Sequence, residues 1–275
     1  MTLPDLLEVE RAVELGSRIL RQGRSHVGAL VAKGDRDFAT AVDLQIEAAV
    51  KAALVAVAPG VPFLGEESGG DAIGSGPIWV LDPVDGTVNF ARGSPLCGVS
   101  LAFLEEGRPR MAIVDLPFLG ERYVAVEGAG AFRNGRPVRC RAAGRLGQAI
   151  VGLSDFSVGR DAPVENPVHL ALLAELSHRA LRVRLHGSEA VDLAWTASGR
   201  LGATIMLSNL PWDVSGGVLV VREAGGVVFD LDGSTHSPWA RWTIASSPDL
   251  RDPLLELIGS VPALDRLVDA GATAP

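Results

Sequence analysis

Residues 79–90 read Trp-Val-Leu-Asp-Pro-Val-Asp-Gly-Thr-Val-Asn-Phe. A short apolar run leads into Asp-Pro and Asp-Gly, two dipeptides that are common in turns, so a simple turn is one interpretation. The proline between the two aspartates fixes the backbone and removes one donor. Gly86 and Thr87 then open a short predicted helix whose free N–H groups can face an anion. Carboxylates beside an anion-binding helix end indicate a divalent cation between Asp82, Asp85 and a phosphate.

Two further acidic motifs flank this stretch at a distance. Residues 65–70 (Gly-Glu-Glu-Ser-Gly-Gly) follow a short apolar run, and taken alone they are typical of a solvated turn. Residues 211–213 (Pro-Trp-Asp) precede an apolar helix that we expect to end near Gly225. We expect Asp213 to be the N-cap of that helix, and a helix start aimed at a cleft would also carry its carboxylate to the same site.

Together the three motifs offer four carboxylates, from Glu66, Asp82, Asp85 and Asp213, without an adjacent lysine or arginine. Gathered without cations, these groups would repel one another or take up protons. Oxygen-only ligands suit Mg²⁺, with Mn²⁺ as a substitute, and no His or Cys cluster points to zinc. The sequence therefore predicts a magnesium site that receives a small phosphorylated metabolite.

The surrounding sequence divides into two halves, 1–143 and 144–275. In the first half, apolar spacing predicts helices over about 5–22 and 41–57, the second with Asp43 and Glu47 on one face. Short apolar runs with close turn signals then predict an antiparallel meander over 61–138. In the second half strands and helices alternate, which favours a layered α/β unit. We expect strands near 149–154, 181–187, 203–207, 227–230 and 242–247, and helices near 165–179, 188–199 and 212–226.

Composition narrows the class of protein. The net charge is −8, from 33 acidic and 25 basic residues, which disfavours nucleic-acid binding. The apolar runs are too short for membrane spans, and the N-terminus lacks the pattern of a secretory signal, so we expect a cytoplasmic protein. Cys97 and Cys140 are too few for a disulfide framework.

On these motifs the sequence resembles the inositol monophosphatase family of magnesium-dependent, lithium-sensitive phosphatases. A further match is residues 37–43 (Asp-Phe-Ala-Thr-Ala-Val-Asp) with Glu47. The resemblance implies a layered α/β/α/β/α sandwich, usually a homodimer. It also implies that magnesium is bound by Glu66, Asp82, the Val84 carbonyl, Asp85 and Asp213. Thr87, supported by Asp43 and Glu66, would orient and activate the attacking water, and Gly86 and Thr87 would offer N–H groups to the phosphate.

The resemblance also implies hydrolysis of a phosphate monoester by in-line attack of a metal-activated water. Asp85, Gly86, Thr87, Gly187, Ser188, Glu189 and Asp213 would contact the substrate. Glu189 departs from the small residue usual in the family, and residues 205–210 lack an acid that family members often use to hold inositol hydroxyls. Glu189 is then either a replacement acceptor or, as the sequence slightly favours, a solvated residue at a helix start.

Three groups of alternatives stay open. An inositol or similar polyol monophosphate is the first expectation for the substrate. Fructose 1,6-bisphosphate, adenosine 3′,5′-bisphosphate and histidinol phosphate are substrates of related phosphatases. A non-catalytic protein that binds RNA or another partner on the same fold is a third possibility, although such a module has no need for so many clustered acids.

Overall fold

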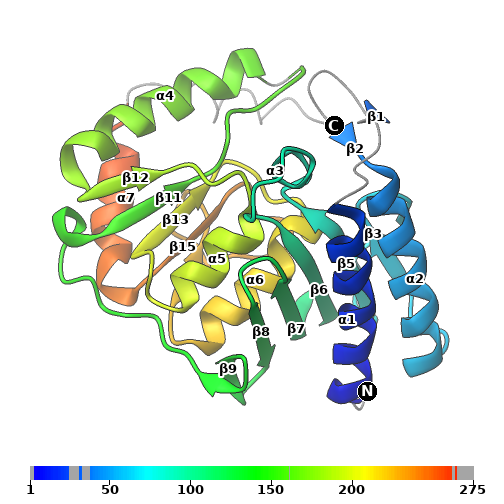
Figure 1. Cartoon of the computed structure of the whole chain (residues 1–275). Helices are drawn as coiled ribbons and strands as arrows, with labels where there is room; N and C mark the ends of the chain where they lie inside the picture. The colour runs from blue at the N-terminus through cyan, green and yellow to red at the C-terminus, as the bar shows by residue number, and fades with distance from the viewer. Residues whose placement is uncertain (1–2, 25–30, 33–37, 161, 262–263, 265–275) are drawn as a thin grey trace.

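The computed structural model describes residues 3–24, 31–32, 38–160, 162–261 and 264. Asp37, in the first motif of the family resemblance, lies outside the described residues. The elements form five layers, with helices on the outer faces of two sheets and a helix pair between the sheets (Figure 1). This arrangement confirms the expected α/β/α/β/α sandwich.

The first layer is the helix pair α1 (Leu6–Gly23) and α2 (Ala41–Val57). The Asp5 side chain caps α1 by accepting from the N–H of Leu7 at 2.9 Å. Thr40 and Asp43 form a reciprocal capping box at the start of α2. The two helices pack closely at Gly16, where a Cβ would lie 3.0 Å from methyl carbons of Ile46 and Val50.

The second layer is an eight-stranded sheet in the order β10-β9-β8-β7-β6-β5-β3-β4. From β5 to β10 each strand pairs antiparallel with the next, which confirms the meander for these strands. The prediction is wrong for its first strand, since β3 runs parallel to β5. Every residue of β5 is buried. The strands are β3 (Phe63–Gly65), β4 (Gly69–Gly70), β5 (Ile78–Asp85), β6 (Gly98–Glu105), β7 (Arg108–Leu116), β8 (Glu121–Val126), β9 (Gly130–Arg133) and β10 (Arg136–Pro137). Short strands β1 (Val31–Ala32) and β2 (Phe38–Ala39) form a separate pair.

The central layer is the pair α5 (Glu189–Ala197) and α6 (Pro211–Glu223). Seven of the nine residues of α5 are buried, because it lies between both sheets. Two glycines let α6 approach its neighbours. A Cβ on Gly217 would lie 2.4 Å from Leu193 of α5, and one on Gly216 would lie 2.6 Å from Ser100 of β6.

The fourth layer is a five-stranded mixed sheet in the order β12-β11-β13-β15-β14. Its middle strand β13 runs parallel to β11 and antiparallel to β15. Outer helices α4 (Ala162–Arg179) and α7 (Arg251–Gly259) cover the far face (Figure 1). The strands are β11 (Ile150–Leu153), β12 (Arg182–Arg184), β13 (Ala203–Met206), β14 (Val227–Phe229) and β15 (Thr243–Ser246). The alternation of strands and helices predicted for this half is confirmed.

One apolar cluster joins the two halves of the chain. It combines residues of β7 and β8, such as Val114 and Tyr123, with residues of α5 and α6, such as Leu193 and Val218. The division at residue 143 stays a prediction. Within the described ranges, no helix is both long enough and apolar enough to cross a membrane.

The close packing of α5 on α6 predicts that an alanine substitution in α6 destabilises the protein instead of stabilising it. In an open helix Gly→Ala stabilises by about 1 kcal/mol. Gly217→Ala should instead lower the free energy of unfolding by about 1–3 kcal/mol, because the new methyl group collides with Leu193. Urea denaturation measures the change. Gly259→Ala in α7 is the matched control, since a Cβ there meets nothing within 4 Å. Equal effects of both substitutions would refute this packing.

Candidate functional site

A pocket of about 210 Å³ lies where the end of β5 meets the starts of α5 and α6. Both halves of the chain contribute to it, and it brings together most of the residues singled out from the sequence. Asp43 and Ser188 lie behind its surface and contact lining residues. The lining residues are Glu66, Asp82, Val84, Asp85, Gly86, Thr87, Val88, Asp155, Gly187, Glu189 and Asp213.

Asp82 lies at the centre of the charge cluster. The pairing of β5 with β6 shifts register between Asp82 and Asp85, and the Asp82 carboxylate accepts from the Val84 N–H at 2.8 Å. The side chain is buried, and burial raises its pKa well above the ordinary value. The negative charges of Glu66, Asp85 and Asp213 raise the pKa further, and a hydrogen bond with the Glu66 carboxyl favours the protonated form. These four carboxyl groups therefore lie close enough together to compete for the same protons or cations.

The loop that carries Glu66 is held from beneath by Glu47 of α2. The Glu47 carboxylate accepts from the N–H of Glu67 at 3.0 Å and from the N–H of Ser68 at 2.9 Å. A Cβ on Gly65 would lie 2.2 Å from the same carboxylate, so a larger residue there would displace Glu47 from these two N–H groups. Asp43 and Glu47, expected on one helical face, are both buried here.

Thr87 begins the short helix α3 (Thr87–Ala91) and its hydroxyl connects three elements. It lies 3.0 Å from the Val84 carbonyl oxygen and 3.3 Å from Asp43 Oδ1. Burial raises the pKa of Asp43, while donors from Thr40 oppose that rise. Gly86 precedes α3 with φ +80°, and a Cβ there would lie 2.8 Å from the Leu96 carbonyl oxygen. The N-cap residue Gly86 has no side chain, and no described side chain caps α3, so its first N–H groups are free of a described cap at the pocket.

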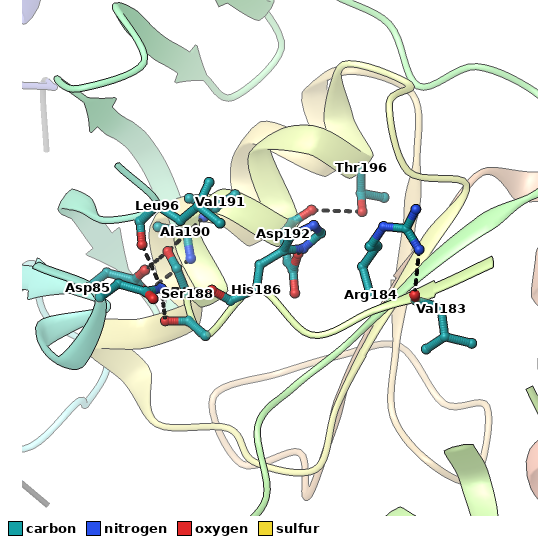
Figure 2. A network of polar contacts seen from close by, with 12 residues as sticks. Asp85, Leu96, Val183, Arg184, His186, Ser188, Ala190, Val191, Asp192 and Thr196 are labelled. Carbon is teal, nitrogen blue, oxygen red and sulfur yellow. Dashed lines mark hydrogen bonds and ion pairs between the residues drawn. The ribbon is translucent and has the colours of Figure 1, made fainter. Parts of the chain in front are cut away.

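Asp85 ties the first half of the chain to α5 of the second half. Its carboxylate accepts from the Ser188 hydroxyl and from the Ala190 N–H at 3.0 Å, as Figure 2 shows. Ser188 in turn caps α5 by accepting from the Val191 N–H at 3.2 Å. Burial raises the pKa of Asp85 to about 7, even though the Ser188 and Ala190 donors favour the charged form.

Glu189 and Asp155 form a second acidic wall of the pocket. Glu189 is half-buried and faces the pocket, so its interpretation as a solvated residue is wrong. The reason is that α5 starts between the two sheets instead of at the surface. Burial, together with the charges of Asp85 and Asp192, raises the pKa of Glu189 to about 8. Asp155 was missed, although an acid placed just after strand β11 is a signal for a site at the carboxyl end of a parallel strand.

Asp213 reaches the pocket from a different helical position than expected. The N-cap of α6 is Leu210, Pro211 occupies the first turn, and Asp213 is the third helical residue. The prediction that Asp213 caps α6 is therefore wrong. Pro211 suits the first turn because it needs no N–H partner there. Asp213 still lies in the first turn, where its charge is favoured by the helix dipole.

The donor chemistry of the pocket fits a hard divalent cation. Six acidic residues line it, and none of its described lining residues is lysine or arginine. As they stand, no three His, Cys, Asp or Glu side chains of the described ranges are arranged to hold a metal ion. A cation that enters the pocket would compete with the proton that the hydrogen bond between Asp82 and Glu66 favours.

Comparisons with known proteins identify the family to which the chain is similar. A family model described as the inositol monophosphatase family matches residues 6–262. The probable inositol 1-monophosphatase ImpA of Mycobacterium tuberculosis is 43% identical over 84% of this chain and 85% of its own length. Inositol-1-monophosphatase ImpA of Mycolicibacterium smegmatis is 40% identical over 84% and 83%. The extragenic suppressor protein suhB of Bartonella henselae superposes with a TM-score of 0.86 at 28% identity, over 93% of this chain and 98% of that one.

The raised pKa values predict that the metal-free protein loses stability as pH rises from 7 to 9. Asp85 and Glu189 hold their protons more tightly when folded, with pKa values of about 7 and about 8, than in the unfolded chain, where about 4 is ordinary. The stability that their protonated forms contribute is complete below pH ~4 and is lost as pH rises through these values. The pH range of 7 to 9 lies above the usual His pKa of about 6.5. Buried His169 and His236 have lowered pKa values, so below about pH 6.5 their titration makes the stability rise with pH, opposite to the effect of Asp85 and Glu189.

The urea midpoint in excess chelator measures this slope. Glu189→Gln should flatten the curve near pH 8, while Asp252→Asn, whose side chain is 85% exposed, should leave it unchanged. A wild-type midpoint that rises between pH 7 and 9 would contradict the assignment.

Proposed function

The chain belongs to the inositol monophosphatase family, and on that premise we propose that it hydrolyses an inositol or similar polyol monophosphate with the help of Mg²⁺. It is a phosphomonoesterase of that family. The observation that carries the proposal is the crowding of Glu66, Asp85 and Asp213 around buried Asp82, in a pocket without a described basic residue. A cluster of carboxylates repels a phosphate, so it can bind one only when a cation adds positive charge between them.

The proposed metal ligands are the carboxylates of Glu66, Asp82, Asp85 and Asp213 and the carbonyl oxygen of Val84. When bound, magnesium supplies positive charge that offsets the phosphate and the charge that develops during hydrolysis. The protein holds the ligands through backbone donors. Asp82 accepts from the Val84 N–H, Asp85 accepts from the Ala190 N–H, and Glu47 fixes the loop of Glu66.

Thr87 and Asp43 are proposed to orient the attacking water. The Thr87 hydroxyl has one proton, and both the Val84 carbonyl and Asp43 Oδ1 lie within hydrogen-bond reach of it. Donating to either one leaves its lone pairs free to accept from a water molecule. Asp43 Oδ2 is occupied by the Thr40 N–H at 3.0 Å, which fixes the carboxylate and leaves Oδ1 facing Thr87. The raised pKa of Asp43 brings its basicity nearer to neutral pH.

The phosphate is proposed to lie at the start of α3. Gly86 and Thr87 line the pocket, and their N–H groups belong to a helix start that no side chain caps. Backbone N–H groups in this position bind phosphate oxygens without adding a mobile cation. This leaves the polyol to face Gly187, Glu189 and Asp155 on the opposite wall. A protonated Glu189 donates a hydrogen bond to a hydroxyl, and an ionised one accepts from it.

Removing one ligand should abolish hydrolysis without unfolding the protein. Asp82→Asn and Asp213→Asn should each lower kcat at least about a hundredfold, since a metal ligand supplies several kcal/mol of charge stabilisation. Release of inorganic phosphate from inositol 1-phosphate with Mg²⁺ measures this. The urea midpoint of metal-free Asp82→Asn should stay level or rise, because an amide cannot acquire the negative charge that burial and the neighbouring acids disfavour at this position. Asp232→Asn, at an exposed turn, is the control. Full activity of Asp82→Asn, or wild-type activity in chelator, would exclude the metal scheme.

Glu189, in the second acidic wall, should affect which substrate the protein prefers. Glu189→Ala should raise KM for inositol 1-phosphate about tenfold, the cost of one lost polar contact to a hydroxyl. The KM for 4-nitrophenyl phosphate, which offers no hydroxyl to that wall, should change by less than about twofold. Glu175→Ala on outer helix α4 is the control. Equal changes for both substrates would show that Glu189 acts on the shared chemistry and not on specificity.

We also propose that the protein assembles as a homodimer and is inhibited by lithium. Both properties are implied by the family resemblance. Sedimentation velocity and phosphate release in the presence of LiCl test them separately.

A further inference from the structure

A second and larger cavity, of about 580 Å³, lies beside α6 and shares no lining residue with the acidic pocket. Three segments enclose it: the turn between β6 and β7, one face of α6, and the loop between β14 and β15. Asp213 in the first turn of α6 belongs to the acidic pocket, whereas Ser215, Val218, Leu219 and Arg222 of the same helix face the second cavity. The remaining lining residues are Glu106, Gly107, Arg108, Pro109, Glu127, Glu223, Thr235, His236, Ser237, Pro238 and Trp239.

The cavity holds two guanidinium groups, those of Arg108 and Arg222. Arg222 is half-buried and donates to the His236 carbonyl oxygen at 2.7 Å, a neutral partner. Neither Arg222 nor Arg108 forms an ion pair with a described residue. Burial lowers the pKa of Arg222, and the positive charge of Arg108 lowers it further. Two like charges that face one cavity, one of them partly removed from water, favour the entry of an anion.

Two of the three glutamates that line the cavity are engaged elsewhere. Glu223 accepts from the N–H of Gly128 at 2.9 Å and of Gly130 at 2.8 Å, so it caps the turn after β8. Glu127 pairs with Arg110 at 2.5 Å. Glu223 keeps its negative charge, because its two donors are neutral N–H groups. The pKa of Arg222 nevertheless reflects burial and the charge of Arg108 and none of the three glutamates, so its guanidinium is not paired with these acids.

The rim of the cavity is apolar and aromatic. Trp239 is 72% exposed, an unusual position for a side chain with so much apolar surface. Its ring lies against the β6–β7 turn, because a Cβ on Gly107 would be 3.1 Å from a ring carbon. Pro109, Val218 and Leu219 add apolar wall. A flat apolar group that enters here would cover the exposed indole, while Pro109, Val218 and Leu219 are already buried and form the wall behind it.

We propose that this cavity binds a small organic anion, whose charged group contacts Arg108 and Arg222 while its flat apolar part lies against Trp239. The volume falls within the range of small-molecule sites, roughly 300–1,000 Å³. Arginine suits a planar or tetrahedral oxyanion because it donates two parallel hydrogen bonds. The site is independent of the proposed phosphatase function, since the two pockets lie on different parts of α6.

Calorimetric titration with 2-naphthalenesulfonate tests the proposal on the full chain, because a sulfonate is no substrate for a phosphatase. Neutral 2-naphthalenemethanol and inorganic sulfate are the comparison probes. The sulfonate should bind at least about tenfold more tightly than either one, since each comparison probe lacks one half of the recognised chemistry. Arg108→Gln and Trp239→Ala should each weaken binding about tenfold, the effect of one lost charge-assisted or aromatic contact.

Arg108 and Trp239 are exposed, so both variants should keep the thermal midpoint of the wild type, which is measured alongside. Arg136→Gln, another exposed arginine on the first sheet, is the matched control and should bind the sulfonate as the wild type does. No binding of the sulfonate at millimolar concentration would overturn the proposal. Equal affinity for the neutral probe, or equal weakening by Arg136→Gln, would also overturn it.

Discussion

Electrostatic repulsion among buried carboxylates is the constraint on which this structure depends. Asp82 lies within the fields of Glu66, Asp85 and Asp213, and burial strengthens each of those interactions. Without a cation the cluster meets this cost by keeping protons, as the pKa of about 7 for Asp85 shows. The fold also opposes the repulsion with backbone dipoles, since Asp85 accepts from the start of α5 and Asp213 lies in the first turn of α6. A site built in this way is poised to exchange protons for a divalent ion.

The layered architecture brings acids that are distant in sequence to one point. Strand β5 ends where α5 and α6 begin, because both helices lie between the sheets with their starts toward the same pocket. Glycine makes this close packing feasible at Gly217, where a side chain would overlap Leu193. Asn89 adds a further connection between the halves, since its amide nitrogen lies 2.7 Å from the His186 carbonyl oxygen and 2.9 Å from that of Leu96. The close helix packing at Gly217 and the hydrogen bonds of Asn89 thus both fix the elements that carry the acidic side chains.

Local signals were sufficient for most of the longer elements and for most of the site, although helix α7 was not predicted. The bounds of α2 follow from its apolar spacing and from Pro59-Gly60 beyond its end, and the meander follows from its turn residues. The cluster of Glu66, Asp82, Asp85 and Asp213 was predicted because the acids occur in unusual local patterns. The environment of Glu189 was not predicted, because its burial depends on where the second sheet places α5. The N-cap of α6 was predicted at Asp213, three residues after the observed N-cap Leu210, because Pro211 occupies the first helical position. The cavity around Arg222 is formed by three segments that are far apart in the chain, so no local sequence pattern predicts it.

The central claim is that the acidic cluster binds divalent cations at the junction of β5, α5 and α6. Anomalous diffraction from crystals grown with Mn²⁺, recorded at the manganese edge, tests it most directly. The account predicts an anomalous peak among the carboxylates of Glu66, Asp82, Asp85 and Asp213, with the Glu66–Asp82 hydrogen bond broken. Full-occupancy manganese elsewhere, with Glu66 and Asp82 still sharing their proton, would contradict it.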